Sequence, residues 1–311
     1  MRILATAEVP AVAHDAFAHL GPIEVVDATH SLATAEVLIV RGMRLDADAL
    51  RGATGLRAIA RTGAGYDNID VEAATRLGIP VVYAPGVGSQ PIAEGTVALM
   101  LAAAKRLRQL DTLVRQAAWD SRYAVMGLDL DGACLGIVGF GAIGRRVARL
   151  CHGLGMRVIA HDPALTGLRQ SGVPLVTLEE LVARADVISL HCDLTDRTRG
   201  LIDRDLLGRM KPGAILVNVA RGQIVESEDA LADALERGQL SAVALDVFPF
   251  EPPDPHHRLY EDPRVICSPH VVGLTARWNE EVFHALARGV ESALAGEVPP
   301  NVLNPEALAR D

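Results

Sequence analysis

The sequence predicts an α/β protein with two doubly wound parallel-sheet domains. Short runs of Val, Ile, Leu and Ala alternate with helical segments along most of the chain, as in folds built from repeated βα units. Half of the residues are hydrophobic but only 4% are aromatic, which suits layers packed from small aliphatic side chains. A chain of 311 residues is long enough for two domains, each with its own core.

The first series of strand-like runs occupies the amino-terminal part of the chain. The expected strands are Arg2–Thr6, Ile23–Asp27, Glu36–Arg41, Arg57–Arg61 and Ile79–Tyr83. Helical or turn segments separate them. One is Val71–Leu77, which Gly78 should close because glycine accepts the left-handed conformation at a helix end. This alternation predicts a parallel sheet with helices on both faces.

A long helical pattern over Ile92–Ala118 should carry the chain into a second series. The expected strands there are Cys134–Val138, Arg157–His161, Asp186–His191, Ala214–Val219, Ser241–Asp246 and Arg264–Cys267. Helices are expected at Arg145–Leu154 and at Glu228–Arg237, with Gly238 as the cap of the second.

The last helical run, Asn279–Ala295, leaves too little chain for a third domain and should return to the first. The expected domains are therefore 1–98 plus 281–311, which is discontinuous, and 99–280.

Composition and charge exclude several classes of function. The net charge of −9, without a basic stripe, argues against a nucleic-acid partner. The apolar run Val97–Ala104 is too short for a bilayer, which needs about 20 residues, and no signal peptide is visible. The cysteines are far apart and form no metal-spaced pair: Cys134, Cys151, Cys192 and Cys267. We expect a cytoplasmic protein without a metal site or a membrane partner.

A glycine motif lies between the first strand and the first helix of the second series. Gly139, Gly141 and Gly144 follow Cys134–Val138, and Asp162 ends the next strand about 20 residues further on. Glycines here permit a tight turn, close approach of a pyrophosphate and close packing of helix on strand, and the helix N-terminus favours phosphate. Asp162 could accept hydrogen bonds from an adenosine ribose and would repel a 2′-phosphate. The motif predicts NAD binding, with NAD preferred over NADP.

Three polar residues follow the ends of three successive strands in the second series. Arg221 follows Ala214–Val219, Glu251 lies in the proline-rich loop after Ser241–Asp246, and His270 follows Arg264–Cys267. Each alone is more typical of a surface or loop residue. Ligands of open α/β sheets bind at the carboxyl ends of the strands, so all three are expected on the side of the glycine motif. Chemistry beside a nicotinamide needs a proton donor and a cation for an oxygen-rich substrate, and these side chains supply both.

Several motifs in the same order resemble those of the D-isomer-specific 2-hydroxyacid dehydrogenase family, nearly from end to end. They are Arg61–Asp70, Pro85-Gly86, Ala93-Glu94, the glycine motif with Asp162, Asn218–Gly222, Leu245–Pro252 and Ser268–His270. The resemblance implies a Rossmann NAD-binding domain, a smaller flavodoxin-like substrate domain and a homodimer.

The resemblance also implies roles for particular residues. Arg221 would hold the carboxylate and carbonyl oxygen of a 2-keto acid, with backbone N–H groups at Ala64 and Gly65 binding the carboxylate. His270 would donate a proton to the carbonyl oxygen as hydride arrives, and Glu251 would fix the tautomer of the imidazole. Asp246 would contact the nicotinamide carboxamide. The other cofactor contacts would be Thr96, Gly139, Gly141, Ala142, Ile143, Gly144, Asp162, Val219, Ala220, His270 and Gly273.

Departures from the family pattern leave the substrate open. Tyr83, Val87–Gln90 and Val271-Val272 differ from the usual residues near the substrate or cofactor. Glyoxylate, hydroxypyruvate, phosphoglycerate and longer acids all remain candidates. Glu251 argues against a formate dehydrogenase, whose histidine is paired with glutamine. A phosphite-oxidising enzyme with the same Arg–Glu–His set and a dinucleotide-sensing binding protein remain alternatives.

Overall fold

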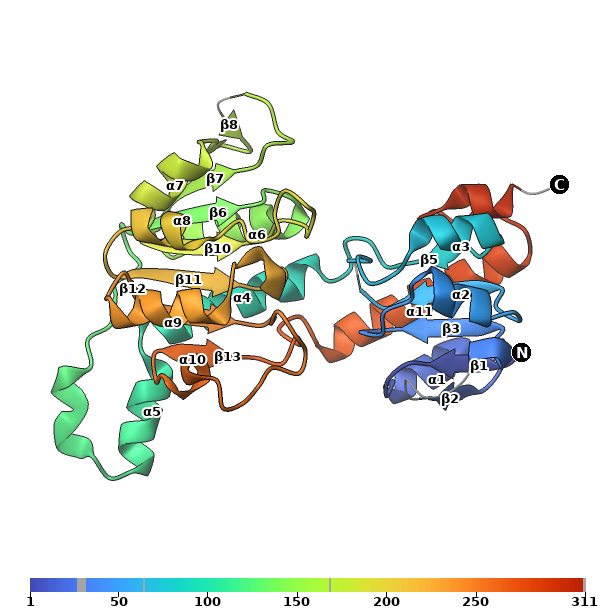
Figure 1. Cartoon of the computed structure of the whole chain (residues 1–311), viewed down its shortest axis with the longest axis horizontal. Helices are drawn as coiled ribbons and strands as arrows, with labels where there is room; N and C mark the ends of the chain where they lie inside the picture. The colour runs from blue at the N-terminus through green and yellow to red at the C-terminus, as the bar shows by residue number, and fades with distance from the viewer. Residues whose placement is uncertain (27–31, 64, 168, 310–311) are drawn as a thin grey trace. The chain divides into compact units, whose positions relative to one another are not determined.

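A computed structural model describes residues 1–26, 32–63, 65–167 and 169–309, and the chain divides into two units. The first unit combines Met1–Gly88 with Leu274–Asp311, and the second is Ser89–Gly273 (Figure 1). The predicted boundaries were 98/99 and 280/281. The shift at the first boundary arises because the whole of helix α4 (Ser89–Ala104) packs on the sheet and on α6 (Ala142–Gly153) of the second unit.

The first unit contains a five-stranded sheet in which every pair of neighbours is parallel. Its strands are β1 (Ile3–Ala5), β2 (Ile23–Val25), β3 (Val37–Val40), β4 (Ala58–Arg61) and β5 (Val81–Val82). They lie in the order β2-β1-β3-β4-β5, which is the flavodoxin-like order.

Helices cover both faces of this first sheet. Neighbouring residues point to opposite faces, so Ile3 joins the core beneath α1 and α11, whereas Leu4 joins the core beneath α2 and α3. The helical segments are α1 (Ala11–Phe17), η1 (Leu32–Thr34), α2 (Ala47–Gly52), α3 (Val71–Leu77), α11 (Ala276–Leu294) and η4 (Pro305–Leu308). The predicted cap of α3 is confirmed: Gly78 has φ +73° and closes the helix.

The second unit contains a six-stranded parallel sheet and a short antiparallel hairpin. The strands of the sheet are β6 (Cys134–Val138), β7 (Arg157–His161), β10 (Val187–Leu190), β11 (Ala214–Asn218), β12 (Leu240–Leu245) and β13 (Val265–Cys267). The hairpin is β8 (Arg169–Gln170) with β9 (Val173–Pro174). The sheet order is β13-β12-β11-β10-β6-β7, and a parallel bridge from Ala160 to Leu175 adds one more segment beside β7. This arrangement corresponds to the order of dinucleotide-binding folds.

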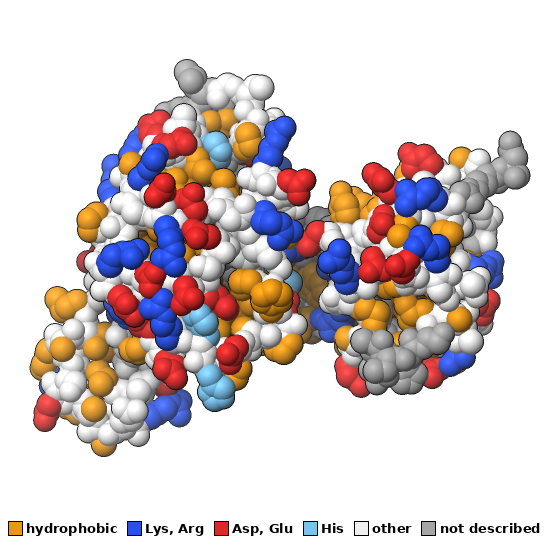
Figure 2. Space-filling model, in the orientation of Figure 1, with side chains coloured by type: hydrophobic (Ala, Val, Ile, Leu, Met, Phe, Trp, Pro, Cys, Tyr) orange, Lys and Arg blue, Asp and Glu red, His pale blue; other side chains and the backbone are white. Residues whose placement is uncertain are grey.

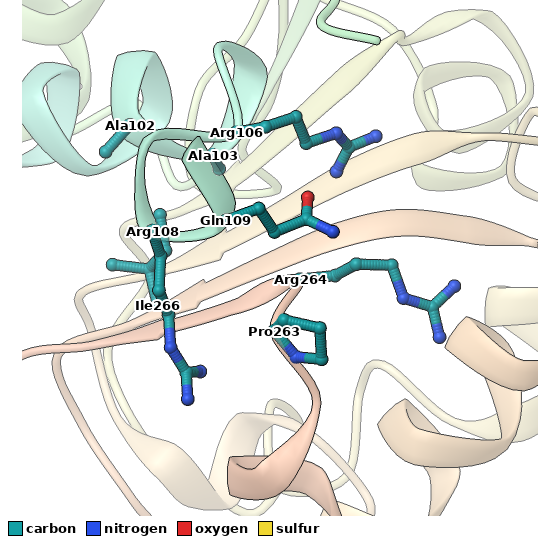
Figure 3. Close-up of a pocket in the computed structure, with 8 residues that line it drawn as sticks. All are labelled: Ala102, Ala103, Arg106, Arg108, Gln109, Pro263, Arg264 and Ile266. Atoms are coloured by element: carbon teal, nitrogen blue, oxygen red, sulfur yellow. The ribbon is translucent and has the colours of Figure 1, made fainter. Parts of the chain in front are cut away.

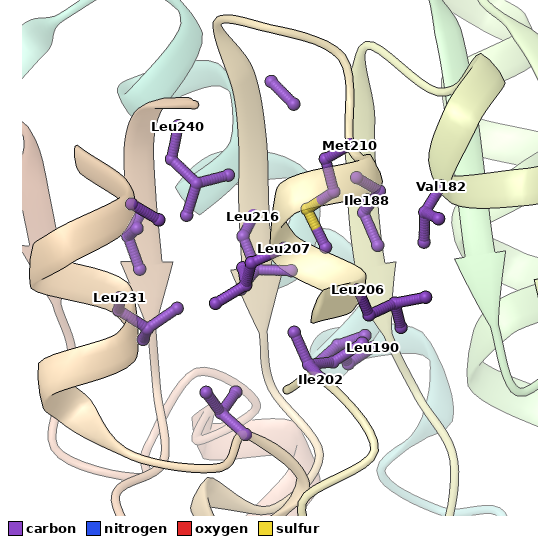
Figure 4. Packing of buried hydrophobic residues seen from close by; sticks show 14 of the residues in the cluster. Val182, Ile188, Leu190, Ile202, Leu206, Leu207, Met210, Leu216, Leu231 and Leu240 are labelled. Carbon is purple, nitrogen blue, oxygen red and sulfur yellow. The ribbon is translucent and has the colours of Figure 1, made fainter. Parts of the chain in front are cut away.

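Two cores flank the second sheet. On one face, Leu206, Leu207 and Met210 pack toward the strand residues Ile188 and Leu216 (Figure 4). On the other face, α4 and α6 cover the sheet. The remaining helical segments are α5 (Leu107–Arg115), η2 (Trp119–Ala124), α7 (Leu178–Arg184), α8 (Arg204–Arg209), η3 (Gly222–Ile224), α9 (Glu228–Glu236) and α10 (Arg258–Glu261).

The expected single helix Ile92–Ala118 is wrong, because two helices occupy that segment. Helix α4 ends at Ala104, and Arg106 takes a left-handed conformation with φ +56° before α5 begins. The guanidinium of Arg106 donates hydrogen bonds to the carbonyl oxygens of Ser241 and Met126, which ties the break to β12 and to the segment after η2. Helix α5 and η2 therefore form an arm at the side of this unit (Figure 1).

Across residues 1–26, 32–63, 65–167 and 169–309, we find no helix with the length and apolar character that crossing a membrane requires.

Candidate active site

The parallel register of the second sheet brings three loops to one edge. Asn218 of β11 is aligned with Leu245 of β12, which is aligned with Cys267 of β13. The loops that follow these three residues carry Arg221, Glu251 and His270, so they leave the sheet at the same level. Sequence positions about 20 to 30 residues apart thus meet at the carboxyl edge of the sheet, where ligands of such folds bind.

His270 and Glu251 form a direct hydrogen-bonded pair. The imidazole Nδ1 lies 3.0 Å from Oε1 and 2.8 Å from Oε2 of Glu251. The backbone N–H of Phe248 donates a further hydrogen bond of 3.2 Å to Oε1. The side chains of His270 and Glu251 are 46% and 41% exposed, so each is partly packed against the protein and partly accessible to solvent.

The charge state of Glu251 follows from these contacts. Burial alone would raise the pKa of Glu251, but the hydrogen bond and charge of His270, the Phe248 N–H and the positive charge of Arg221 outweigh it and lower the pKa below 4.5. A lowered carboxyl pKa means that the stabilisation is present above the ordinary value and is lost as pH falls through the lowered one. The carboxylate of Glu251 therefore stays ionised in the neutral range.

Asp246 holds the backbone of the histidine loop. His270 has φ +57°, a conformation that residues other than glycine adopt rarely. The N–H groups of Val271 and Val272 donate hydrogen bonds of 3.0 and 3.1 Å to Oδ1 of Asp246, which is only 3% exposed. Burial raises the pKa of Asp246, and hydrogen bonds from Ser268, Val271 and Val272 oppose this effect. The carboxylate thus fixes the turn that presents the imidazole.

Asn218 holds the arginine loop in the same way. Its side-chain Nδ2 donates to the carbonyl oxygen of Arg221 at 2.9 Å, and its Oδ1 accepts from the N–H of Ala220 at 3.1 Å. Asn218 is 1% exposed and therefore rigid. Asn218 belongs to one of the motifs shared with the family, but no role was predicted for it. A polar residue at the end of the apolar run Ala214–Val217 was the available clue.

The glycine motif forms a tight loop between β6 and α6. Gly139 has φ +90°, and a Cβ there would lie 2.5 Å from the backbone nitrogen of Cys192. A Cβ on Gly144 would lie 2.4 Å from the carbonyl oxygen of Gly139, whereas a Cβ on Gly141 would meet no atom within 4 Å. Two glycines are therefore required by packing, and the third leaves open space above the start of α6.

Asp162 lies beside this loop at the end of β7. Its Oδ2 accepts a hydrogen bond of 2.9 Å from the N–H of Phe140, and its Oδ1 accepts one of 3.0 Å from Ala164. Each carboxylate oxygen has capacity for a further hydrogen bond. The two backbone contacts fix the orientation of the carboxylate next to the glycine loop.

The other predicted cofactor residues have varied surroundings. Thr96 is fully buried and donates its hydroxyl to the carbonyl oxygen of Ile92 at 2.7 Å. Gly273 lies against the side chain of Ile92, where a Cβ would approach to 2.5 Å. Ala142 and Ile143 form the first turn of α6, and Val219 and Ala220 precede Arg221.

The predicted substrate loop belongs to the first unit. Ala64 lies outside the described residues. The carbonyl oxygen of Gly65 accepts a hydrogen bond of 2.8 Å from Nε of Arg61, the last residue of β4. A Cβ on Gly63 would lie 3.2 Å from the guanidinium of Arg61, so a positive charge lies directly against this loop.

A family model for the NAD-binding domain of the D-isomer specific 2-hydroxyacid dehydrogenases matches residues 97–272. The chain belongs to this family. The match covers most of the second unit, which is therefore the family's NAD-binding domain.

Known members of the family are similar over most of the chain. A D-3-phosphoglycerate dehydrogenase of Archaeoglobus fulgidus is 40% identical over 272 residues, 86% of this chain and 51% of that protein. A glyoxylate reductase of Aeropyrum pernix is 41% identical over 273 residues, 85% of this chain and 81% of that protein. The chain spans about half the length of the phosphoglycerate dehydrogenases that it matches.

Solved structures show the same fold. The TT0316 protein of Thermus thermophilus has a TM-score of 0.89 and 37% identity, covering 97% of this chain and 100% of that one. D-lactate dehydrogenase from Aquifex aeolicus, complexed with NAD and lactic acid, has a TM-score of 0.86 and 27% identity, covering 97% and 99%. The predicted family, the cofactor NAD and the fold of two parallel-sheet α/β domains are confirmed.

The residues of this chain fit a dinucleotide. The open space above Gly141 is where a pyrophosphate could approach the backbone, and the N-terminus of the twelve-residue helix α6 offers free N–H groups to it. When bound, NAD supplies the hydride acceptor and donor of the family's chemistry.

A second histidine in this unit has a different character. His191 follows β10, and its backbone lies against Gly139. Its Nε2 is 2.8 Å from the hydroxyl of Ser189, while Nδ1 is buried without a hydrogen-bond partner in the described part of the chain. Burial lowers the pKa of His191 to about 3, so it remains neutral and cannot act as a proton donor near neutral pH. The open, carboxylate-paired His270 is the better candidate.

An arginine-lined cavity lies at the other end of β13. Arg106, Arg108 and Arg264 line it together with Ala102, Ala103, Gln109, Pro263 and Ile266 (Figure 3). Pro263 and Arg264 precede β13, whereas His270 follows it, so this cavity is not part of the candidate active site.

In the described segments, no group of three or more His, Cys, Asp or Glu side chains could hold a metal ion.

The glycine loop generates a test that separates folding from cofactor binding. Replacing Gly141 by alanine should leave the free protein stable, because the added Cβ meets no atom, but it should weaken NADH binding by about tenfold or more through a clash with the pyrophosphate. Thermal unfolding and a fluorescence titration with NADH measure the two effects. Gly208→Ala in α8, also in open space, is the matched control. Unchanged NADH affinity in Gly141→Ala would contradict the assignment of the glycine loop as the pyrophosphate site.

Proposed function

We propose that this chain is an NAD-dependent oxidoreductase that interconverts a 2-keto acid and a D-2-hydroxy acid by hydride transfer. The observation that carries the proposal is the Glu251–His270 pair beside Arg221, at the carboxyl edge of the sheet that also bears the glycine loop. Membership in the dehydrogenase family supports the same chemistry.

The residues proposed to bind the substrate suit an anion. The planar guanidinium of Arg221 can hold the carboxylate and the carbonyl oxygen through parallel N–H groups. The backbone at Ala64 and Gly65, in the first unit, would bind the carboxylate. The positive charge of Arg61 behind this loop favours an anionic substrate.

Proton transfer is assigned to His270. Its Nδ1 is engaged by Glu251, so Nε2 is the atom that would meet the substrate. In reduction, protonated His270 donates from Nε2 to the carbonyl oxygen while hydride reaches the carbonyl carbon, giving a hydroxyl group. In oxidation, the neutral imidazole accepts the same proton. The carboxylate of Glu251 stabilises the imidazolium in both directions.

The acid–base assignment predicts a large effect at one histidine. Replacing His270 by asparagine should lower kcat by about 10²- to 10⁴-fold, the usual contribution of a positioned proton donor, with NADH binding retained. The assay is the loss of NADH absorbance with glyoxylate, hydroxypyruvate, pyruvate and 3-phosphohydroxypyruvate. His152→Asn, at an exposed position on α6, is the control.

The same assay decides between the rival functions. Phosphite with NAD is included, because a phosphite-oxidising enzyme would use the same Arg–Glu–His set. Turnover of phosphite alone would replace the keto-acid proposal, and NADH binding without turnover of any of these compounds would favour a dinucleotide-sensing protein.

We also propose that the cofactor preference is set by Asp162, whose carboxylate is oriented by Phe140 and Ala164 beside the glycine loop. The double variant Asp162→Gly with Pro163→Arg should shift the ratio of kcat/KM for NADH and NADPH toward NADPH by about tenfold or more. Asp162→Asn, which retains the size and removes the charge, should shift it less. An unaltered preference in the double variant would refute the ribose contact.

We propose further that the protein forms a homodimer through the arm of α5 and η2. Among the described residues of the second unit, large apolar side chains concentrate there (Figure 2): Leu107, Val114, Trp119, Tyr123 and Met126 are 53 to 78% exposed. Arg122 stacks on both Trp119 and Tyr123, at 5.0 and 4.3 Å from the ring centroids. Aromatic and arginine side chains of this kind dominate protein interfaces, and a second copy supplies the same apolar arm.

The dimer is tested by light scattering after gel filtration. Trp119→Ala with Tyr123→Ala should weaken association by about 100-fold or more, since such anchors each contribute at least a tenfold effect, and should shift the mass toward that of a monomer. Val298→Ser, at an exposed apolar position of the first unit, should leave the mass unchanged. A wild-type protein that is monomeric at micromolar concentration would disprove the interface.

A further inference from the structure

We propose that Gln223 is a positioning residue that couples the arginine loop to the glutamate loop. This inference rests on the proposed function, since it assigns Gln223 a part in the geometry of Arg221, Glu251 and His270. Gln223 lies in η3, two residues after Arg221, and no role was predicted for it.

The side chain of Gln223 forms a hydrogen bond between the two loops. Its Nε2 donates to the carbonyl oxygen of Pro249 at 2.7 Å, and the side chain is partly buried. The backbone carbonyl oxygen of Gln223 accepts a hydrogen bond of 2.9 Å from the N–H of Gly200, so the backbone that carries the side-chain amide is anchored. Gln223 is therefore a fixed donor directed at the segment that leads to Glu251.

The glutamate loop is held from two sides. Pro249 lies two residues before Glu251, and the N–H of Phe248 donates to the Glu251 carboxylate at 3.2 Å. Gly222 touches the same segment, because a Cβ at this position would lie 2.0 Å from the carbonyl carbon of Phe248. Two hydrogen bonds thus hold the loop. One runs from Gln223 to the carbonyl oxygen of Pro249, and the other runs from the N–H of Phe248 to the carboxylate of Glu251.

The glutamate loop is incompletely packed. Its position therefore depends more on the hydrogen bond from Gln223 to Pro249. A small cavity lies under the two loops, lined in part by Asn218, Gly222, Ser227, Leu231 and Pro249. Side chains that leave a cavity restrain a loop less than close packing does. The bond from Gln223 is a polar restraint on Pro249, which lines this space.

The effect of losing Gln223 should fall on one loop. Arg221 keeps its own anchor, because Nδ2 of Asn218 donates to its carbonyl oxygen at 2.9 Å. The glutamate loop would lose the hydrogen bond between Gln223 and Pro249, so the carboxylate that contacts His270 would be less well placed. We therefore expect a loss in kcat, which depends on proton transfer, with KM nearly unchanged, since Arg221 still holds the substrate.

Gln223→Met tests this inference, because methionine has a similar length and no N–H donor. The matched control is Gln239→Met. Gln239 is also half-buried and donates its Nε2 to a backbone carbonyl oxygen, that of Met210, but it lies just before β12, at the opposite end of that strand from the glutamate loop. Both variants lose one bond of the same kind.

Two measurements are compared between these variants. For Gln223→Met, kcat should fall about tenfold with KM within about twofold, and amide hydrogen exchange across residues 246–252 should become about fivefold faster, as expected for one lost hydrogen bond. Gln239→Met should retain kcat and the wild-type exchange rate in this segment. Equal kcat values for the two methionine variants, or a rise in KM at constant kcat, would overturn the proposal.

Hydrogen exchange distinguishes failure of this inference from failure of the proposed function. If the wild-type protein reduced no 2-keto acid, the proposed function would fall, and exchange in 246–252 would still report whether Gln223 restrains the loop. Unchanged exchange in Gln223→Met would refute the positioning role whatever the activity.

Discussion

The alignment of three parallel strands is the constraint on which the candidate active site depends. Asn218, Leu245 and Cys267 lie side by side across β11, β12 and β13, so the loops after them start at one level. A shift of a single residue in this register would turn each following side chain to the other face. The buried apolar residues of both faces fix the register, because a slip would move them from one closely packed core into the other. The packing that stabilises the core therefore also sets the geometry of the site.

Buried polar side chains convert this frame into a defined site. Asn218 and Asp246 are each at most 3% exposed, and each directs its hydrogen bonds to the backbone of a loop that carries a proposed functional residue. Burial raises the pKa of Asp246, whereas His270 and Arg221 help to lower that of Glu251. One carboxylate supports the backbone and the other supports an imidazole, although both follow the same strand. Their surroundings, and not their chemical type, separate the two roles.

Local patterns predicted most of the second sheet. The expected strands Cys134–Val138 and Arg157–His161 are observed with these bounds, because apolar runs flanked by turn residues are a strong local pattern. The helix expected over Ile92–Ala118 was wrong, since nothing local to Lys105-Arg106-Leu107 opposes a helix. The break at Arg106 depends on acceptors at Ser241 and Met126, far away in the sequence. Propensity cannot report such contacts.

The sequence by itself determined the order of the motifs, the two series of βα units and the chemical types at the strand ends, because these follow from short-range periodicity and spacing. The Glu251–His270 pair was expected from the family resemblance, and the structure shows that Nδ1 makes the contact. Only the tertiary structure decided the other contacts: it bound Asp246 to the N–H groups of Val271 and Val272, and directed Gln223 at Pro249. Such hydrogen bonds join segments brought together by strand register and packing, and a contact of a few ångströms is not encoded in the spacing of residues along the chain.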